Sequence, residues 1–374
     1  MSRAIQEILK VADVRVNGDR PWDIVVHDKR FWRRIALFGN IGLGDAYVDG
    51  WWDCSAIDEM IHRLLDVASR RERQPWIVYL CGYLTGTIFN LQSLPRAFQV
   101  GERHYDIGND LYEAMLGKDL VYSCAYWQAG AKSLEEAQRD KLELVCRKIS
   151  LKPGMRVLDI GCGWGSFCKY AAENYGVELV GLTVSREQAA YATRTLKHLP
   201  VEIRLQDYRT MGGLFDAIVS IGMFEHVGPK NYPHYMRIAR HNLRDEGTFL
   251  LHTIGSNRTN PPVRSWITKH IFPNGYIPSL RQVGGAVEDR FVVEDLQNFG
   301  PDYALTLMEW YRNFEHGWSS LRGRKPQYDE RFRRMWRYYL LSCAGAFRAR
   351  DQQLWQFVLS PKGQAGSYVR PVLG

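Results

Sequence analysis

The feature that most constrains this chain is a regular alternation of strand-like and helix-like segments that begins after residue 150. Short apolar runs alternate there with segments whose apolar residues recur at helical period. Strands joined by crossover helices have this order, and they build a parallel, doubly wound sheet. The predicted fold class is therefore α/β. The strands that we expect are MRVLDIG, VELVGLTV, VEIRLQD, FDAIVSIG and GTFLLHTIG, with helices over 167–175, from 186 onward and over about 235–243.

Other patterns flank this alternation. Residues 1–70 combine the apolar runs DIVVH and RIALFG, glycine-containing turns and the helical segment IDEMIHRLLDV, which favours a small α+β domain. The basic hinge SRRERQP follows, so we expect an N-terminal accessory domain with its linker over 1–100 and a catalytic domain over 101–374. A stretch rich in proline and glycine at about 257–290 predicts an insertion over the active face. The tail predicts a basic aromatic helix, RFRRMWRYYLLSCAGAFRAR, and a last strand, LWQFVLS.

Composition limits the partners and the compartment. Lysine and arginine exceed aspartate and glutamate by 8 charges, which favours anionic partners such as phospholipid headgroups or nucleic acid. The 7 cysteines include no CxxC pair, so we expect no disulfide framework, no metal site and a reducing cytoplasm. The N-terminal segment lacks the pattern of a signal peptide. The uncharged run at 74–95 is interrupted by polar residues and predicts a buried or interfacial helix, not a membrane span.

A glycine-rich turn follows the first strand of the alternation. The segment VLDIGCGWG, residues 157–165, leads from a buried strand into a helix, where backbone N–H groups approach a ligand closely. Its spacing differs from the GxGxxG of dinucleotide-binding turns, and it resembles motif I of the class I methyltransferases. The resemblance implies a Rossmann-like class I fold and an S-adenosylmethionine site. There Gly161 and Gly163 let the amino-acid end of the cofactor lie on the chain, and Asp159 orders the turn.

Polar residues at the ends of the next strands extend the expected cofactor site. Many methyltransferases place a carboxylate after the second strand for the ribose hydroxyls, whereas this chain has LTVSREQ there, with Thr183 and Gln188. The third strand ends in LQDYR. We expect Gln206 or Asp207 to hold the adenine amine and Tyr208 to stack on the adenine ring.

Four further segments are similar to segments of the cyclopropane fatty acid synthase family: YSCAYW (122–127), GMFEHVGPKNY (222–232), LLHTIGS (250–256) and NFGPDYALTLMEWY (298–311). The likeness runs from about Ile41 to residue 355. It is closer to bacterial phospholipid synthases than to mycolic acid cyclopropane synthases, which lack the N-terminal region. It implies methylene transfer from S-adenosylmethionine to the cis double bond of unsaturated phospholipid acyl chains, and cofactor contacts from Tyr122 and Ser123. We also expect a homodimer.

Ring closure places a chemical demand on the reacting centre. Methylation of an isolated alkene by a sulfonium leaves a carbocation, and a base must then take a proton from the methyl group just delivered. The resemblance implies that a bicarbonate ion is this base and is bound by Cys124, Glu225, His252, Tyr303 and the backbone at Ile254. A carboxylate beside an anion requires a shared proton, so we expect Glu225 or the ion to carry one.

Each candidate also has a simpler interpretation. Taken singly, Cys124, His252 and Tyr303 are compatible with core packing, and Glu225 is compatible with a surface charge. Their occurrence at the ends of adjacent elements favours a common site. Cys343 is a weaker candidate for a nucleophile. Because ring closure by methyl transfer needs no covalent enzyme intermediate, we favour a structural role for it.

Three segments combine basic and aromatic residues and are candidates for contact with anionic headgroups: DKRFWRR (28–34), SRRERQPW (69–76) and RFRRMWRYY (331–339). We therefore expect a cytoplasmic protein that associates peripherally with the inner face of the membrane, with lipid binding by the N-terminal domain. No nucleic-acid partner is expected, because SIGMFEHVG stands where an amino-methylating enzyme would carry NPPY or DPPY. Two alternatives stay open: a fatty-acyl C-methyltransferase without ring closure, and a catalytically inactive membrane-surface binding protein.

Overall fold

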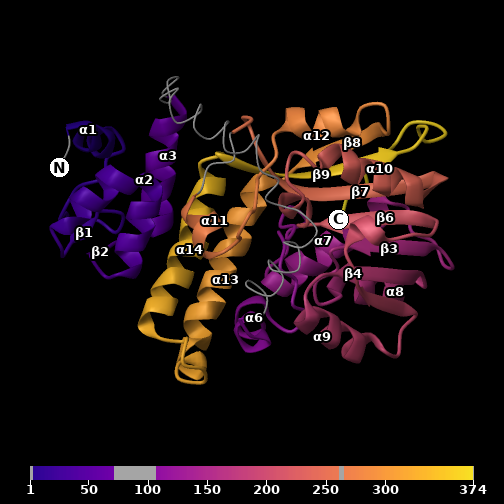
Figure 1. The fold of residues 1–374 in the computed structure, drawn as a ribbon, viewed down its shortest axis with the longest axis horizontal. Helices are drawn as coiled ribbons and strands as arrows, with labels where there is room; N and C mark the ends of the chain where they lie inside the picture. Colours follow the sequence, from indigo (N-terminus) through magenta and orange to yellow (C-terminus); the bar gives the residue numbers. More distant parts are fainter. Residues whose placement is uncertain (1–2, 71–106, 261–264, 374) are drawn as a thin grey trace. The chain divides into compact units, whose positions relative to one another are not determined.

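The computed structural model describes residues 3–70, 107–260 and 265–373, and the chain divides into two compact units (Figure 1). The first unit consists of residues 1–87, 261–273 and 303–352, and the second of residues 88–260, 274–302 and 353–374. Each unit therefore joins segments that are far apart in the sequence. The expected boundary near residue 100 and the uncharged run at 74–95 lie outside the described residues. The division into domains at 1–100 and 101–374 stays a prediction.

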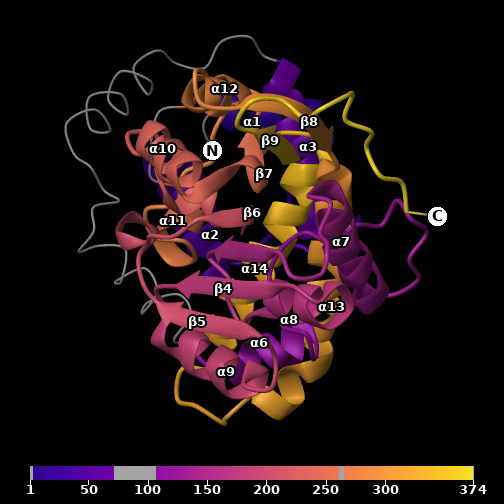
Figure 2. The ribbon, with the colours of Figure 1, turned by 90° about the vertical axis from the view of Figure 1, so that its right-hand side faces the viewer.

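A seven-stranded sheet with the order β5-β4-β3-β6-β7-β9-β8 forms the centre of the second unit, and Figure 2 shows β5, β4, β6 and β7 following one another in this order. Strands β3 to β7 pair in parallel, whereas β8 and β9 are antiparallel to each other. The predicted α/β doubly wound sheet is confirmed. Its strands are β3 (Arg156–Ile160), β4 (Glu178–Thr183), β5 (Val201–Leu205), β6 (Phe215–Ile221), β7 (Leu243–Ser256), β8 (Val292–Asn298) and β9 (Gln352–Ser360).

Helices connect the parallel strands, as the sequence pattern predicts. Serine N-caps begin three of the helices: the side chains of Ser133, Ser185 and Ser279 accept hydrogen bonds from the N–H groups of Glu136, Gln188 and Gln282. The helices of this unit are α6 (Asn109–Leu116), α7 (Leu134–Lys148), α8 (Ser166–Tyr175), α9 (Arg186–Leu196), α10 (Tyr232–Asn242) and α12 (Leu280–Val287), with the 3-10 turns η1 (Tyr208–Thr210) and η2 (Phe224–His226).

Two apolar clusters make up the core of the second unit. Val157 belongs to one cluster, and the next residue along β3, Leu158, belongs to the other. Successive side chains of a strand point to opposite faces, so the two clusters lie on the two faces of the sheet. Both faces are therefore covered. The site must therefore lie at the ends of the strands, where the loops begin.

The first unit is mainly helical. The run DIVVH contains the two-residue strand β1, whereas RIALFG lies inside α2, because a short apolar run fits a helix as well as a strand. The second strand, β2, also has two residues and pairs with β1. The elements of this unit are α1 (Arg3–Val11), β1 (Val25–Val26), α2 (Arg30–Val48), β2 (Trp52–Asp53), α3 (Ile57–Arg70), α11 (Trp266–His270), most of α13 (Gly300–Leu321), and α14 (Glu330–Arg348).

Close helix contacts hold the first unit together. A Cβ atom at Gly345 of α14 would come within 2.5 Å of the Asp58 carbonyl oxygen on α3, so only glycine permits this approach. Arg348 adds an ion pair of 2.8 Å to Asp58, and Arg334 adds one of 2.8 Å to Asp53. Within the described ranges, the helices are all too short or too polar to cross a bilayer.

Candidate active site

The glycine-rich turn lies at the carboxyl end of β3 and has a backbone that favours glycine. Gly161, Gly163 and Gly165 have φ angles of 89°, 57° and 84°, in the left-handed region that other residues rarely adopt. The N–H groups of Gly161 and Cys162 both donate to the Leu182 carbonyl oxygen, at 2.9 and 2.8 Å. These two bonds fix the turn against β4. The conformation of the turn is therefore set by its bonds to the neighbouring strand.

Gly163 faces open space beside two polar side chains. A Cβ atom at Gly163 would find its nearest neighbour, Nε2 of Gln188, 4.0 Å away. Thr183 donates through Oγ1 to Oε1 of Gln188 at 2.8 Å, and both side chains are buried. The turn, Thr183 and Gln188 thus border one gap. The motif implies that the amino-acid end of S-adenosylmethionine lies here, and this placement stays a prediction.

Asp159 is buried beneath the turn. Its carboxylate accepts a hydrogen bond of 3.5 Å from Sγ of Cys168. Burial raises the pKa of Asp159 to about 7, although the Cys168 hydrogen bond and the positive charge of Lys141 act in the opposite direction. Lys141 therefore lies close enough to favour the ionised form of this carboxyl group.

The three residues expected around the adenine are engaged in local structure. Gln206 donates through Nε2 to the Thr210 carbonyl oxygen at 2.9 Å, and Asp207 caps η1 by accepting from the Arg209 N–H at 2.9 Å. Tyr208 is buried in the core, with its ring 5.0 Å from that of Tyr235. The adenine contacts of Gln206, Asp207 and Tyr208 stay predictions.

Tyr122 and Ser123 lie near the turn. The ring of Tyr122 packs edge-to-face on Tyr112 at 5.4 Å, and Tyr112 lies 4.8 Å from the ring of Trp164, which is part of the turn. Ser123 accepts a hydrogen bond of 2.7 Å from Nζ of Lys141, and its carbonyl oxygen accepts one of 2.9 Å from Nε2 of Gln138. The segment expected to contact the cofactor is thus held by α7 and is connected to the turn through Tyr112 of α6.

Glu225 and Ile254, both expected around the bicarbonate ion, contact each other. The Ile254 backbone N–H donates to Oε1 of Glu225 at 2.6 Å. The second oxygen, Oε2, is buried and has no hydrogen-bond partner among the described residues. Burial raises the pKa of Glu225 to about 7, even though the Ile254 N–H favours the ionised form. Glu225 can therefore hold or release a proton near neutral pH.

His252 lies two residues before Ile254 on β7 and points to the same face of the strand. The amide Nε2 of Gln356 on β9 lies 3.1 Å from Nδ1 of His252, and with the amide as donor the proton of the neutral ring is on Nε2. Burial lowers the pKa of His252 well below its usual value, and the charges of Lys141 and Lys148 lower it further. Nε2 has no partner in the described part of the chain. His252 is thus a neutral hydrogen-bond donor.

The two candidate cysteines differ in their surroundings. Cys124, which follows Ser123 in the chain, is fully buried, and its Sγ donates to the Ala125 carbonyl oxygen at 3.1 Å. Cys124 and Lys141 interact electrostatically, which places the thiol near the same ammonium group as Asp159. Cys343 lies on α14 in the first unit, and burial raises the pKa of its thiol to about 12. A thiol with such a pKa is a poor nucleophile at neutral pH.

Tyr303 belongs to the first unit, unlike the other residues expected around the ion. Within that unit, its ring lies 4.6 Å from Phe347 and 5.9 Å from Trp310. The structure therefore brings together Glu225, Ile254 and His252 and links Cys124 to them through Lys141. The participation of Tyr303 stays a prediction.

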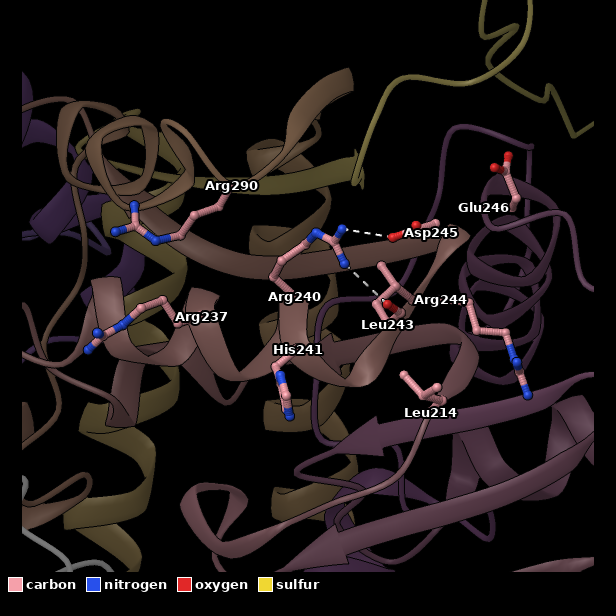
Figure 3. A pocket seen from close by; sticks show the side chains of 9 residues that line it. All are labelled: Leu214, Arg237, Arg240, His241, Leu243, Arg244, Asp245, Glu246 and Arg290. Carbon is pink, nitrogen blue, oxygen red and sulfur yellow. Dashed lines mark hydrogen bonds and ion pairs between the residues drawn. The ribbon is translucent and has the colours of Figure 1, made fainter.

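A hollow of about 800 Å³ lies elsewhere on the second unit (Figure 3). Arg237, Arg240, Arg244 and Arg290 contribute to its lining, and Arg240 is paired with Asp245 at 2.9 Å. The hollow lies at the amino ends of β6 and β7, whereas Glu225 and His252 lie toward the carboxyl ends of these strands. None of the candidate site residues lines it.

Comparison with known proteins places the chain in a family. Residues 92–357 match the family model described as mycolic acid cyclopropane synthetase. The chain is 49% identical over 358 residues to a cyclopropane-fatty-acyl-phospholipid synthase of Escherichia coli K12, and the match covers 96% of this chain and 93% of the relative. The chain belongs to this cyclopropane synthetase family.

Solved structures agree with this assignment. The cyclopropane synthase MmaA2 from Mycobacterium tuberculosis is 32% identical, with a TM-score of 0.65, and the match covers 70% of this chain and 97% of that one. The mycolic acid cyclopropane synthase CmaA1, complexed with SAH and CTAB, is 32% identical, with a TM-score of 0.64 and the same coverage. The chain is an S-adenosylmethionine-dependent methyltransferase of this family with the class I fold. The E. coli relative matches the N-terminal region as well, as the sequence predicts for the phospholipid synthases of the family.

Residue-by-residue reasoning did not find Lys141, Gln138 or Gln356. Lys141 and Gln138 are polar residues on the buried face of α7, one turn apart in the segment LEEAQRDKLELVC. Their position among the apolar residues of that face, which also carries the buried Lys148, was a detectable signal. Gln356 occupies a buried strand, where an amide side chain needs a partner. Which partner it finds depends on the pairing of the strands, and that pairing is not visible in the sequence.

Proposed function

We propose that this protein transfers a methylene group from S-adenosylmethionine to the cis double bond of unsaturated phospholipid acyl chains, with bicarbonate as the general base. When bound, S-adenosylmethionine supplies the sulfonium methyl group and bicarbonate supplies a basic oxygen. The similarity to the E. coli synthase, 49% identity over 96% of this chain, supports the choice of substrate. The observation that carries the proposal is the hydrogen bond from the Ile254 N–H to the buried Glu225, close in the chain to the buried His252, with polar atoms of both side chains left to bind a ligand.

The polar atoms at this site fit a small oxyanion. His252 presents an N–H donor at Nε2, and protonated Glu225 offers an O–H donor at Oε2. Because the pKa of Glu225 is near 7, this carboxyl group can share a proton with an anion and so avoid charge repulsion. In our proposal these residues bind and orient the base. Cys124, Tyr303 and the backbone of Ile254 are proposed to complete the site.

We propose that Tyr122, Ser123, Asp159, Gly161, Gly163, Thr183 and Gln188 hold the cofactor. The gap beside Gly163 supports this placement, because a closely packed turn would leave no space for a ligand. Gln206 and Asp207 would lie toward the adenine end. Asp159 would act indirectly, by keeping the turn in place from its buried position under it.

We propose peripheral association with the inner face of the membrane, a cytoplasmic location and a homodimer. Within the first unit, Leu37 and Phe38 are 63% and 60% exposed next to the exposed Arg33. An apolar pair beside a cation suits the interface of an anionic bilayer.

Most arginines of the two described basic segments are engaged in ion pairs within the protein: Arg30 pairs with Asp28, Arg34 and Arg331 with Asp49, Arg333 with Glu315, and Arg334 with Asp53. The segment 69–76 falls almost entirely outside the described residues.

Product analysis tests the proposed function. The purified protein is incubated with S-adenosylmethionine and vesicles of a cis-unsaturated phospholipid, and the acyl chains are analysed by mass spectrometry and proton NMR. We expect cyclopropane signals. A methyl-branched chain would support the alternative C-methyltransferase, and a methylene branch, which is isomeric with the ring, is distinguished by NMR. Binding of S-adenosylmethionine without any turnover would favour the inactive membrane-surface protein.

A further inference from the structure

Two lysines on α7, Lys141 and Lys148, are almost completely buried, with exposed fractions of 1% and 0%. Lys148 lies 3.7 Å from the carboxylate of Asp295, which also pairs with Arg370 at 2.5 Å. Lys141 has no carboxylate within ion-pair distance in the described ranges, and it donates to the neutral hydroxyl of Ser123 at 2.7 Å. Burying an ammonium group without a paired charge costs free energy. Folding stability alone does not explain its presence.

The neighbours of Lys141 show what it contacts. One turn earlier on α7, Gln138 donates to the carbonyl oxygens of Ser123 at 2.9 Å and Val121 at 3.4 Å. The Ala137 carbonyl oxygen accepts from the Tyr126 N–H at 2.9 Å. One face of α7 therefore holds the segment 121–126 by main-chain and side-chain bonds. Lys141 is the member of this set that binds a side chain.

The charge of Lys141 acts on several residues of the candidate site. Burial lowers the pKa of Lys141 to about 7, and interactions with Cys124 and Asp159 raise it. In turn, Lys141 lowers the pKa of Asp159 and contributes to lowering that of His252. These residues come from β3, β7 and the segment 121–126. The ammonium group thus lies close enough to act on residues of both the cofactor site and the proposed base site.

We propose that Lys141 is a positioning residue of the cofactor site, whose ammonium group fixes Ser123, and with it the segment 122–124, beside the glycine-rich turn. The inference rests on the proposed roles of Tyr122 and Ser123 in cofactor binding. Lys141 acts through Ser123 and needs no contact with the reacting atoms. Loss of its hydrogen bond releases the Ser123 side chain and leaves the segment held by Gln138 and Ala137 alone, so the cofactor binds a site that is less completely ordered.

Calorimetric binding of S-adenosylhomocysteine tests this inference without any lipid substrate. Lys141→Met is compared with Lys148→Met, a matched variant on the same helix that leaves Asp295 paired with Arg370. We expect Lys141→Met to raise the Kd about 10-fold, as for loss of a hydrogen bond to a charged group. Lys148→Met should leave the Kd within about twofold of wild type, whatever its effect on the free energy of unfolding, because the ion-pair partner of Lys148 is Asp295 and not the segment 121–126. Lys141→Gln keeps a donor, so it should recover part of the affinity.

A double-mutant cycle separates positioning from a general loss of stability. Ser123→Ala should weaken binding as Lys141→Met does, and the double variant should be little worse than either, because both remove one interaction. In turnover assays, the KM for S-adenosylmethionine should rise about 10-fold while kcat changes less than about threefold.

If Lys141→Met does not fold, an unchanged Kd in Ser123→Ala contradicts the inference. Additive effects, or an equal loss in Lys148→Met, would also overturn it. Failure of the wild type to form cyclopropanes would bear on the proposed function alone.

Discussion

The carboxyl group of Glu225 accepts a hydrogen bond of 2.6 Å from the backbone N–H of Ile254 through one oxygen, and its other oxygen is buried without a partner in the described part of the chain. This asymmetry divides the two oxygens by role. The bonded oxygen fixes the orientation of the carboxyl group against β7, and the other remains available to a ligand. A ligand that shares a proton with this oxygen gains a partner of fixed geometry, which is what a positioned base requires.

The gap beside Gly163 predicts the effect of a larger side chain on cofactor binding. Gly163→Leu places a side chain in the space that borders Gln188 and Thr183, and it also forces a residue other than glycine into a φ of 57°. We expect the affinity for S-adenosylmethionine to fall at least about 100-fold in calorimetry. Gly212→Leu, where an added Cβ atom would also meet open space, is the control. Unchanged affinity in Gly163→Leu would mean that the cofactor binds elsewhere.

Glu225 should make stability depend on pH. Its pKa rises from the usual 4.5 to about 7 on burial, so between these values the folded protein binds more protons than the unfolded chain. The free energy of unfolding therefore falls as the pH rises through this window. We expect Glu225→Gln to reduce that fall by about 2–3 kcal/mol in denaturant titrations between about pH 5 and about pH 7.5. Asp159, which titrates near the same pH, should leave a residual slope. If the free energy of unfolding fell equally with pH in the wild type and in Glu225→Gln, the assigned burial of Glu225 would be contradicted.

Cys343 should be dispensable for the chemistry. Burial raises the pKa of its thiol to about 12, so the nucleophilic thiolate is scarce at neutral pH. Cys343→Ser should retain at least about half of the wild-type kcat, since ring closure needs no covalent intermediate. Circular dichroism serves as the control for folding. A folded variant that has lost turnover would indicate a direct role for this thiol.

Membrane binding should have an electrostatic and an apolar part. Raising the salt concentration from about 0.05 M to about 0.5 M should weaken sedimentation with anionic vesicles, because exposed charges are screened. Leu37→Ser combined with Phe38→Ser should remove most of the binding that persists at high salt. Leu280→Ser, at a similarly exposed leucine of the second unit, is the control. Binding that does not respond to salt, or to the double substitution, would contradict the corresponding part of the proposal.

The strands and helices of the second unit could be predicted because their periodicity is local. The glycine turn after β3 was recognisable for the same reason, since strand, turn and helix follow one another within residues 156–175. The short run RIALFG is too brief for its period to decide between strand and helix, and α2 contains it. Local patterns therefore predicted the sheet and the turn better than the N-terminal elements.

The arrangement of the candidate site depends on contacts between distant residues. The bond between Glu225 and Ile254 joins residues 29 positions apart, and that between Gln356 and His252 joins residues 104 apart. Both require the register of the sheet, which the sequence does not display. The packing of Tyr208 against Tyr235 in the core likewise joins distant residues, and the stacking of Tyr208 on adenine stays a prediction.

The central claim is that Glu225 helps to bind the base that closes the ring, and the turnover of Glu225→Gln tests it most directly. The amide keeps the size of the side chain and removes the shared proton. With carbon dioxide excluded, we expect the kcat of Glu225→Gln to be about 10²–10⁴-fold below wild type and its affinity for S-adenosylmethionine to be unchanged. Bicarbonate added afterwards should restore part of the rate. Wild-type turnover in Glu225→Gln without carbon dioxide, and equally in His252→Ala, would contradict the account.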